Sequence, residues 1–248
     1  MNLPFDLGPW QALWLAVAVF GAAFVRGYSG FGFAALIVSA AGLVTDPLHL
    51  VPVVLIADIL LTAQQARGIW RDVDWRRVAW LGLGCAAGVP LGVWAIAQVG
   101  GDTARLAISL YVLAMCAVLV AGWHLRGTPG GLAHGATGVV SGLANGAAVG
   151  GLPVAAFFAA QTMPAATFRA TLIAYFTLMD IWTLPLMGWA GMITRDTLVA
   201  TALGLPLMVA GVALGSRRFL NANPKGFRRF AIGLLAVLAL LGLLRSLF

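Results

Sequence analysis

Charged side chains are scarce in this chain. Asp, Glu, Lys and Arg together make up 9% of the 248 residues, whereas ordinary soluble domains carry about 25%. Hydrophobic residues make up 61%, and uncharged stretches recur at residues 78–99, 106–123, 197–216 and 230–244. At 1.5 Å per residue, most of these stretches can cross a hydrocarbon core of about 30 Å. The composition excludes an ordinary soluble domain and predicts an all-α polytopic membrane protein.

The chain also has few residues of the kinds that build disulfides, metal sites and nucleotide sites. Its two cysteines, Cys85 and Cys116, fall inside expected membrane spans, where packing is the expected role. Its three histidines, His49, His124 and His134, lie near segment ends without metal-ligand spacing. No Gly-x-x-x-x-Gly-Lys-Ser/Thr motif occurs, which excludes ATP as the direct energy source. The sequence predicts no metal, no cofactor and no enzymatic activity.

The net charge of +7 does not indicate a nucleic-acid partner, because the cations sit in short loops between apolar segments. Cations in such loops orient a chain in the lipid bilayer. The two most basic loops are residues 67–77 and 217–229. The positive-inside rule therefore predicts that both of these loops are cytoplasmic.

One apolar segment, residues 25–42, is interrupted by three glycines, a serine and an arginine between Arg26 and Gly32. Broken backbone is tolerated inside a bilayer only where protein or a water-filled cavity covers its polar groups. Arg26, the Ser29 hydroxyl and the backbone amides near Gly30 and Gly32 could together bind an anion at the start of the next helix. The alternative is a kinked helix whose arginine extends to the membrane interface.

The second half of the chain repeats the plan of the first. Residues 87–92 read AGVPLG and residues 210–215 read AGVALG, an offset of 123. The Val25-Arg-Gly sequence has its counterpart in Val140-Ser-Gly, which leads into a second glycine-rich break at residues 142–153. The sequence therefore predicts two repeats, residues 1–126 and 127–248, each with a broken, re-entrant helix pair and three transmembrane helices. Such repeats are usual in secondary transporters.

The second break supplies its own candidate ligands: Asn145, Gly146, Gly150 and Gly151. If the two repeats are inverted, one break enters the membrane from each side and their tips can meet near the midplane. Transporter substrate sites usually lie there. The alternative for these glycines is close helix packing of the Gly-xxx-Gly kind.

Two aspartates lie within the expected spans, Asp58 in the first half and Asp180 in the second. Each could carry a coupling proton, form an ion pair with Arg26 or Arg169, or be a protonated structural acid. Tyr175 lies close to Asp180 in sequence, and we consider it together with the two acids as a coupling or gating residue. Packing is the alternative role for this tyrosine.

Loop charge also bears on the orientation of the repeats. A single crossing at each break would place the two most basic loops on opposite sides of the membrane. A break that folds back on itself places both loops in the cytoplasm and puts Asp46, Asp102 and Asp196 outside. Each half then crosses an odd number of times, so the charges favour inverted repeats with re-entrant pairs.

Gly27, Gly30 and Gly32 form a Gly-x-x-Gly-x-Gly pattern early in the chain, and a second glycine break opens the second half. With its length and two-half plan, the whole chain resembles the TauE/SafE sulfite exporter family. In the family a proline follows the first break, whereas here only the second half has one, Pro153. The resemblance implies a secondary permease of the plasma membrane for small sulfur-containing anions, such as sulfite or organosulfonates.

Two other classes of function remain open at this point. Gly27-Tyr-Ser-Gly30 fits the pattern around the nucleophile of rhomboid intramembrane serine proteases. That chemistry needs a histidine base on a later membrane helix, and no histidine follows His134. A non-transporting membrane receptor is the third class, and substrate flux into liposomes would separate it from a carrier.

The charge pattern makes a prediction about topology. Cysteines placed near Asp46, Asp102 and Asp196 should react with an impermeant reagent added outside, whereas cysteines at Arg71 and Asn223 should not. Labelling at Asn223 without labelling at Arg71 would replace the inverted arrangement by a parallel one.

Overall fold

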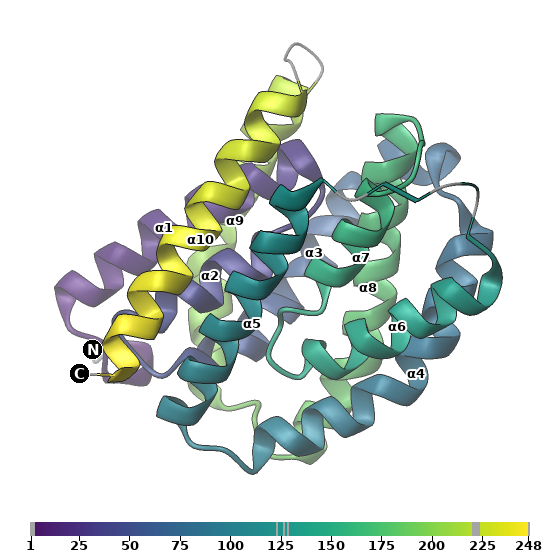
Figure 1. Ribbon diagram of the computed structural model, residues 1–248. Helices are drawn as coiled ribbons and strands as arrows, with labels where there is room; N and C mark the ends of the chain where they lie inside the picture. The colour runs from purple at the N-terminus through teal and green to yellow at the C-terminus, as the bar shows by residue number, and fades with distance from the viewer. Residues whose placement is uncertain (1–2, 123, 126, 128, 220–223, 248) are drawn as a thin grey trace.

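A computed structural model describes residues 3–122, 124–125, 127, 129–219 and 224–247 (Figure 1). The described residues form helices and connecting loops and contain no strand, which confirms the all-α prediction. The α-helices are α1 (Pro9–Ser29), α2 (Phe33–Ala41), α3 (Leu50–Ile69), α4 (Trp75–Ala97), α5 (Gly101–Ala121), α6 (Gly131–Asn145), α7 (Gly151–Ala159), α8 (Ala165–Trp189), α9 (Arg195–Phe219) and α10 (Pro224–Leu247). Short 3-10 helices are η1 (Pro4–Asp6), η2 (Pro47–His49) and η3 (Trp70–Asp72).

Six helices in the described part of the chain are long and apolar enough to cross a membrane: α1, α3, α4, α5, α8 and α9. The prediction of a multi-pass membrane protein is therefore confirmed. In contrast, α2 and α7 have nine residues each. A helix of that length spans only about 14 Å, so neither of them can cross the hydrocarbon core.

Glycine conformation ends α1 and starts α2. Gly30 follows α1 with φ +79°, and its N–H donates to the carbonyl of Arg26 at 2.9 Å. Gly32 precedes α2 with φ +86°. Left-handed backbone is inexpensive only for glycine, so these two residues can reverse the chain within a few positions.

Each short helix folds back along the helix before it. The indole Nε1 of Trp14, near the start of α1, donates to the carbonyl of Ala40 near the end of α2. In the second pair, α7 packs against α6, and the N–H of Leu125, in the linker ahead of α6, donates to the carbonyl of Ala160 just after α7. Both pairs are therefore helical hairpins with unequal arms. Their re-entrant placement in a bilayer stays a prediction.

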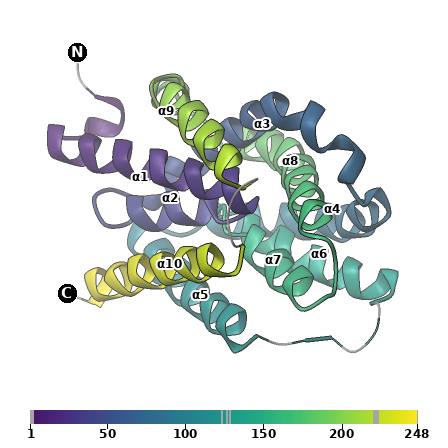
Figure 2. The same cartoon turned by 90° about the horizontal axis from the view of Figure 1, so that it is seen from above.

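The helices of the two halves pack in matching pairs (Figures 1 and 2). The fourth helix of the first half, α4, packs along α6, the first helix of the second half. Correspondingly, α9 packs along α1, while α5 packs on α10 and α3 on α8. Thus the first helix of each half has its main partner in the other half. The division at residues 126 and 127 remains a prediction.

The repeated AGV-x-LG motif forms these contacts between halves. A Cβ atom added at Gly88 or Gly92 of α4 would overlap backbone carbonyls of α6, and one at Gly211 or Gly215 of α9 would overlap backbone of α1. Helices approach this closely where small residues face each other. The motif is therefore a packing motif, and we call the two contacts the α4–α6 and α1–α9 seams.

The acidic loop positions gather at one end of the bundle. Asp46 contacts Gly101 beside Asp102, and the carboxylate of Asp196 accepts from the N–H of Phe5 at 2.7 Å. In the first of the two basic segments, η3 packs on α8. Residues 220–223 of the predicted basic loop, including Asn223, lie outside the described residues.

The seams predict which glycines resist substitution. Gly92→Ala should lower the free energy of unfolding by about 1–3 kcal/mol, because overpacking forces the helices apart. Gly21→Ala is the matched control in α1, where an added Cβ meets no atom within 4 Å; it should be neutral or stabilise by up to about 1 kcal/mol. Thermal unfolding in detergent measures both, and equal stability of the two variants would contradict the α4–α6 seam.

Candidate functional site

The two glycine-rich breaks meet at a cavity inside the helix bundle. Its volume is about 40 Å³, which is room for about three water molecules. One wall consists of the start of α2, from Gly32 to Ala35, and another includes Gly151 and Leu152 at the start of α7. Side chains from α1, α3, α6 and α8 complete the lining. The cavity therefore lies between the two halves of the chain.

Both short helices begin at this cavity and direct their positive dipole ends to it. The first hydrogen bond of α2 runs from the N–H of Leu36 to the carbonyl of Gly32. The three N–H groups before it, from Phe33 to Ala35, have no acceptor within their own helix. The first residue of α7, Gly151, adds its N–H from the other half. Helix N-termini with free amides favour anions.

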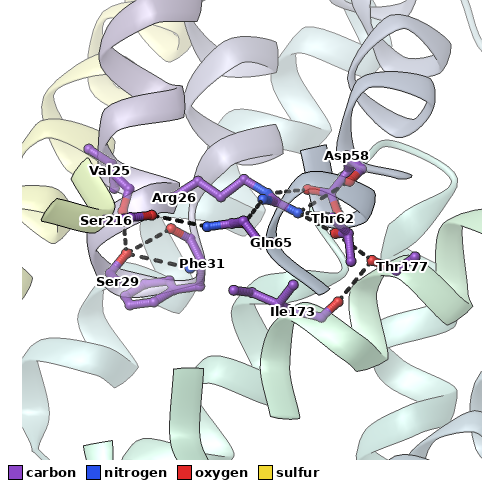
Figure 3. A network of polar contacts seen from close by, with 10 residues as sticks. All are labelled: Val25, Arg26, Ser29, Phe31, Asp58, Thr62, Gln65, Ile173, Thr177 and Ser216. Carbon is purple, nitrogen blue, oxygen red and sulfur yellow. Dashed lines mark hydrogen bonds and ion pairs between the residues drawn. The ribbon is translucent and has the colours of Figure 1, made fainter. Parts of the chain in front are cut away.

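Arg26 lies in the cavity wall as part of a buried ion pair (Figure 3). Its side chain extends from α1 to α3, and the residue is 2% exposed. Nε donates to one Asp58 carboxylate oxygen at 2.6 Å and an Nη2 hydrogen to the other at 3.0 Å. Gln65 and Thr62 accept further hydrogen bonds from Nη1 and Nη2. Arg26 therefore pairs with the acid of its own half and does not extend to a membrane interface.

Several polar residues that hold this pair were not selected from the sequence. Thr62 and Gln65 follow Asp58 by four and seven positions, a spacing that places all three on one helical face. Thr177 donates to Thr62 at 2.7 Å, and Gln65 donates to Ser216 at 3.1 Å. The spacing along α3 could have indicated the first two. The contacts of Thr177 and Ser216 with them depend on the tertiary fold.

Ser29 does not line the cavity. Its hydroxyl lies 2.9 Å from the carbonyl of Val25 and 3.1 Å from that of Phe31, so it satisfies backbone at the end of α1. The described hydrogen bonds of Ser29 are with backbone groups only, and none of them involves a histidine. The arrangement of nucleophile and base that an intramembrane serine protease requires is not supported.

The predicted glycines divide into two groups. Gly30, Gly32 and Gly151 line the cavity, whereas Gly146 and Gly150 do not. A Cβ at Gly146 would overlap the carbonyl of Gly92, and one at Gly150 would overlap that of Ser141. These last two glycines are therefore required for close packing around the second break. Sequence alone cannot separate the two roles, because both select the smallest residue.

Asp180 and Asn145 form the opposite wall of the cavity. The amide Nδ2 of Asn145 donates to the Asp180 carboxylate at 3.2 Å and to the hydroxyl of Thr183 at 2.9 Å. All three residues are buried. Tyr175 is buried as well but lies outside the lining of the cavity. A role for it in coupling or gating stays a prediction.

The ion pair makes a prediction about stability. Arg26→Gln should lower the free energy of unfolding by about 3–5 kcal/mol, because it leaves the Asp58 charge buried and unpaired. Adding Asp58→Asn should restore most of that loss. Asp102→Asn is a control at an exposed ion pair, where the expected cost is below about 1 kcal/mol. Chemical unfolding in detergent measures all three, and a stable Arg26→Gln single variant would refute the buried pair.

Comparison with known proteins identifies the family. The family model described as sulfite exporter TauE/SafE matches residues 15–241. A curated relative from Cupriavidus necator, named a probable sulfite/organosulfonate exporter TauE, is 28% identical over 221 residues and 84% of each chain is covered. No solved structure matches the chain. The family match covers all of α2 to α9 and every residue that lines the cavity, so the chain belongs to the sulfite exporter TauE/SafE family.

Proposed function

We propose that this protein is a secondary-active permease that carries a small sulfur-containing oxyanion, sulfite or an organosulfonate, across the plasma membrane. Membership of the sulfite exporter family and the name of the relative from Cupriavidus necator support this substrate class. The sequence has no ATP-binding P-loop, so the energy source is an ion gradient or the membrane potential.

The observation that carries the proposal is the cavity between two half-length helices. Phe33 to Ala35 and Gly151, whose N–H groups start the two short helices, come from different halves and line one cavity. An oxyanion has several oxygen atoms that can each accept a hydrogen bond from such groups. Transporters of inverted-repeat architecture bind substrates between broken helices near the midplane. The two hairpins would then be re-entrant, one from each side.

Arg26 adds charge and one further donor to this site. A guanidinium has five N–H hydrogens. The hydrogen bonds to Asp58, Thr62 and Gln65 use the Nε hydrogen, both Nη2 hydrogens and one Nη1 hydrogen. One Nη1 hydrogen is left for an anion in the cavity. Because Asp58 balances the charge of Arg26, most of the attraction for an anion comes from the helix N-termini.

The volume of the cavity restricts the substrate. Space for about three waters is close to the size of a sulfite ion, which has four heavy atoms. An organosulfonate has more atoms and requires the hairpins to separate. A small sulfur oxyanion such as sulfite is therefore the expected substrate.

A binding screen tests the proposal directly. Purified protein should bind sulfite and methanesulfonate more tightly than acetate, and it should carry the bound anion into liposomes. Arg26→Lys should weaken binding roughly ten- to a hundredfold, because Lys keeps the charge beside Asp58 but loses the forked donor. Arg71→Lys, in the short helix η3, is the matched control and should bind like the parent.

Two outcomes would contradict the proposal. If a folded Arg26→Lys variant binds as tightly as the parent, Arg26 does not contact the substrate. If the parent binds an anion but carries none into liposomes, the protein is a receptor and not a permease.

A further inference from the structure

We propose that Asp180 carries a proton together with the anion, so that this protein moves one proton in the same direction as each substrate ion. This inference rests on the function proposed above and names its coupling ion. The inference follows from the hydrogen-bond partners of the two buried acids in the cavity, Asp58 and Asp180. They correspond to each other in the two halves, but they have different partners.

The charge balance of the cavity is unfavourable for an anion when both acids are ionised. Its lining contains one cation, Arg26, and two acids, Asp58 and Asp180. With both acids ionised the three side chains have a net charge of −1, and a bound oxyanion would add to it. Like charges in a buried space repel strongly because little water screens them. One acid must therefore be neutral while the anion is bound.

Asp58 is paired with the cation of the cavity, Arg26. Two of its carboxylate contacts are with the Arg26 guanidinium, at 2.6 and 3.0 Å. A paired geometry of this kind stabilises the charged carboxylate strongly. Protonating Asp58 would also leave the Arg26 charge buried without a counterion, which is costly. Asp58 is therefore a fixed part of the wall.

Asp180 has no cation at hydrogen-bond distance among the described residues. Its described hydrogen bond comes from the neutral amide of Asn145, at 3.2 Å. When Asp180 takes up a proton from water on the open side, an O–H bond forms on the carboxylate and the group becomes neutral. That hydroxyl can donate to the bound oxyanion. When the anion leaves on the other side, the proton returns to water there.

Other titratable groups near Asp180 do not replace it. Arg26 and Asp58 lie across the cavity, and Cys85 of α4 and Tyr175 of α8 interact with Asp180 electrostatically. Neither of these last two lines the cavity. The neighbouring helix α7 has the sequence GLPVAAFFA and carries no titratable side chain. Asp180 is thus the described acid that faces the substrate space without a bonded cation.

A proton that travels with each substrate ion sets the net charge that crosses the membrane. A sulfite dianion that travels with one proton carries a net charge of −1. A membrane potential that is negative inside then drives the pair outward, which is the direction of an exporter. Binding of the anion and binding of the proton must also favour each other, because linkage between two ligands is reciprocal.

Calorimetry with methanesulfonate tests the inference, because a sulfonate keeps its charge over the working pH range and any proton taken up goes to the protein. Titrations in two buffers of different ionisation enthalpy count that proton. Above the pH at which Asp180 titrates in the free protein, the parent should take up about one proton per sulfonate, and its affinity should fall about tenfold per pH unit. Asp180→Asn should take up none, and its affinity should not depend on pH. Asp180→Glu should restore proton uptake, and Asp102→Asn should behave like the parent.

The outcomes separate the inference from the proposed function. Sulfonate binding by the parent with no proton uptake and with the same affinity at every pH would overturn the coupling and leave the permease intact. Proton uptake that persists in folded Asp180→Asn would assign the proton to another group and overturn the role of Asp180. A parent that binds neither sulfonate nor sulfite would remove the proposed function, and the inference with it. The measurement on the parent decides the coupling even if Asp180→Asn does not fold.

Discussion

The buried Arg26–Asp58 pair is the contact on which the cavity depends. Moving a single charge into an apolar interior costs several kcal/mol, so each partner can stay there only while the other is in place. Thr62 and Gln65 accept two further guanidinium hydrogens. Together these contacts fix the register of α1 against α3. The break after Arg26, and with it the start of α2, is thereby held at the depth of the cavity.

Glycine has two separate roles around the cavity. They explain which features of the fold could be predicted from the sequence and which could not. At Gly30 and Gly32 the backbone has positive φ, and the fold required glycine for conformation. The interruption of an apolar run made that break predictable. At Gly92 and Gly146 the requirement is close approach of two helices. The repeated motif was visible in the sequence, but its partners on α6 and α1 were not, because sequence spacing does not say which helices touch.

Part of the candidate site was also predictable from the sequence: the polar residues that line it, but not their partners. The cost of burying charge and the glycine breaks were enough to select Arg26, Asp58, Asn145 and Asp180, and all four line the cavity. Sequence could not choose between Arg26 and Arg169 as the partner of Asp58, because that choice depends on packing. It also gave no sign that Ala148, a residue with a Cβ atom, adopts φ +56° in the second break. The two halves therefore have the same order of helices, but the buried aspartate of each half has a different hydrogen-bond partner.

The seams between halves have a consequence for how the chain is made. Helices leave the ribosome in sequence order, and α1 appears long before α9, the helix on which it packs. Until then the face of α1 that packs on Gly211 and Gly215 of α9 lacks its partner helix. The α4–α6 seam closes midway through synthesis, whereas the α1–α9 seam closes only near its end. Neither half can complete its own packing, so the protein reaches its final arrangement as one unit after nearly all its helices are in the membrane.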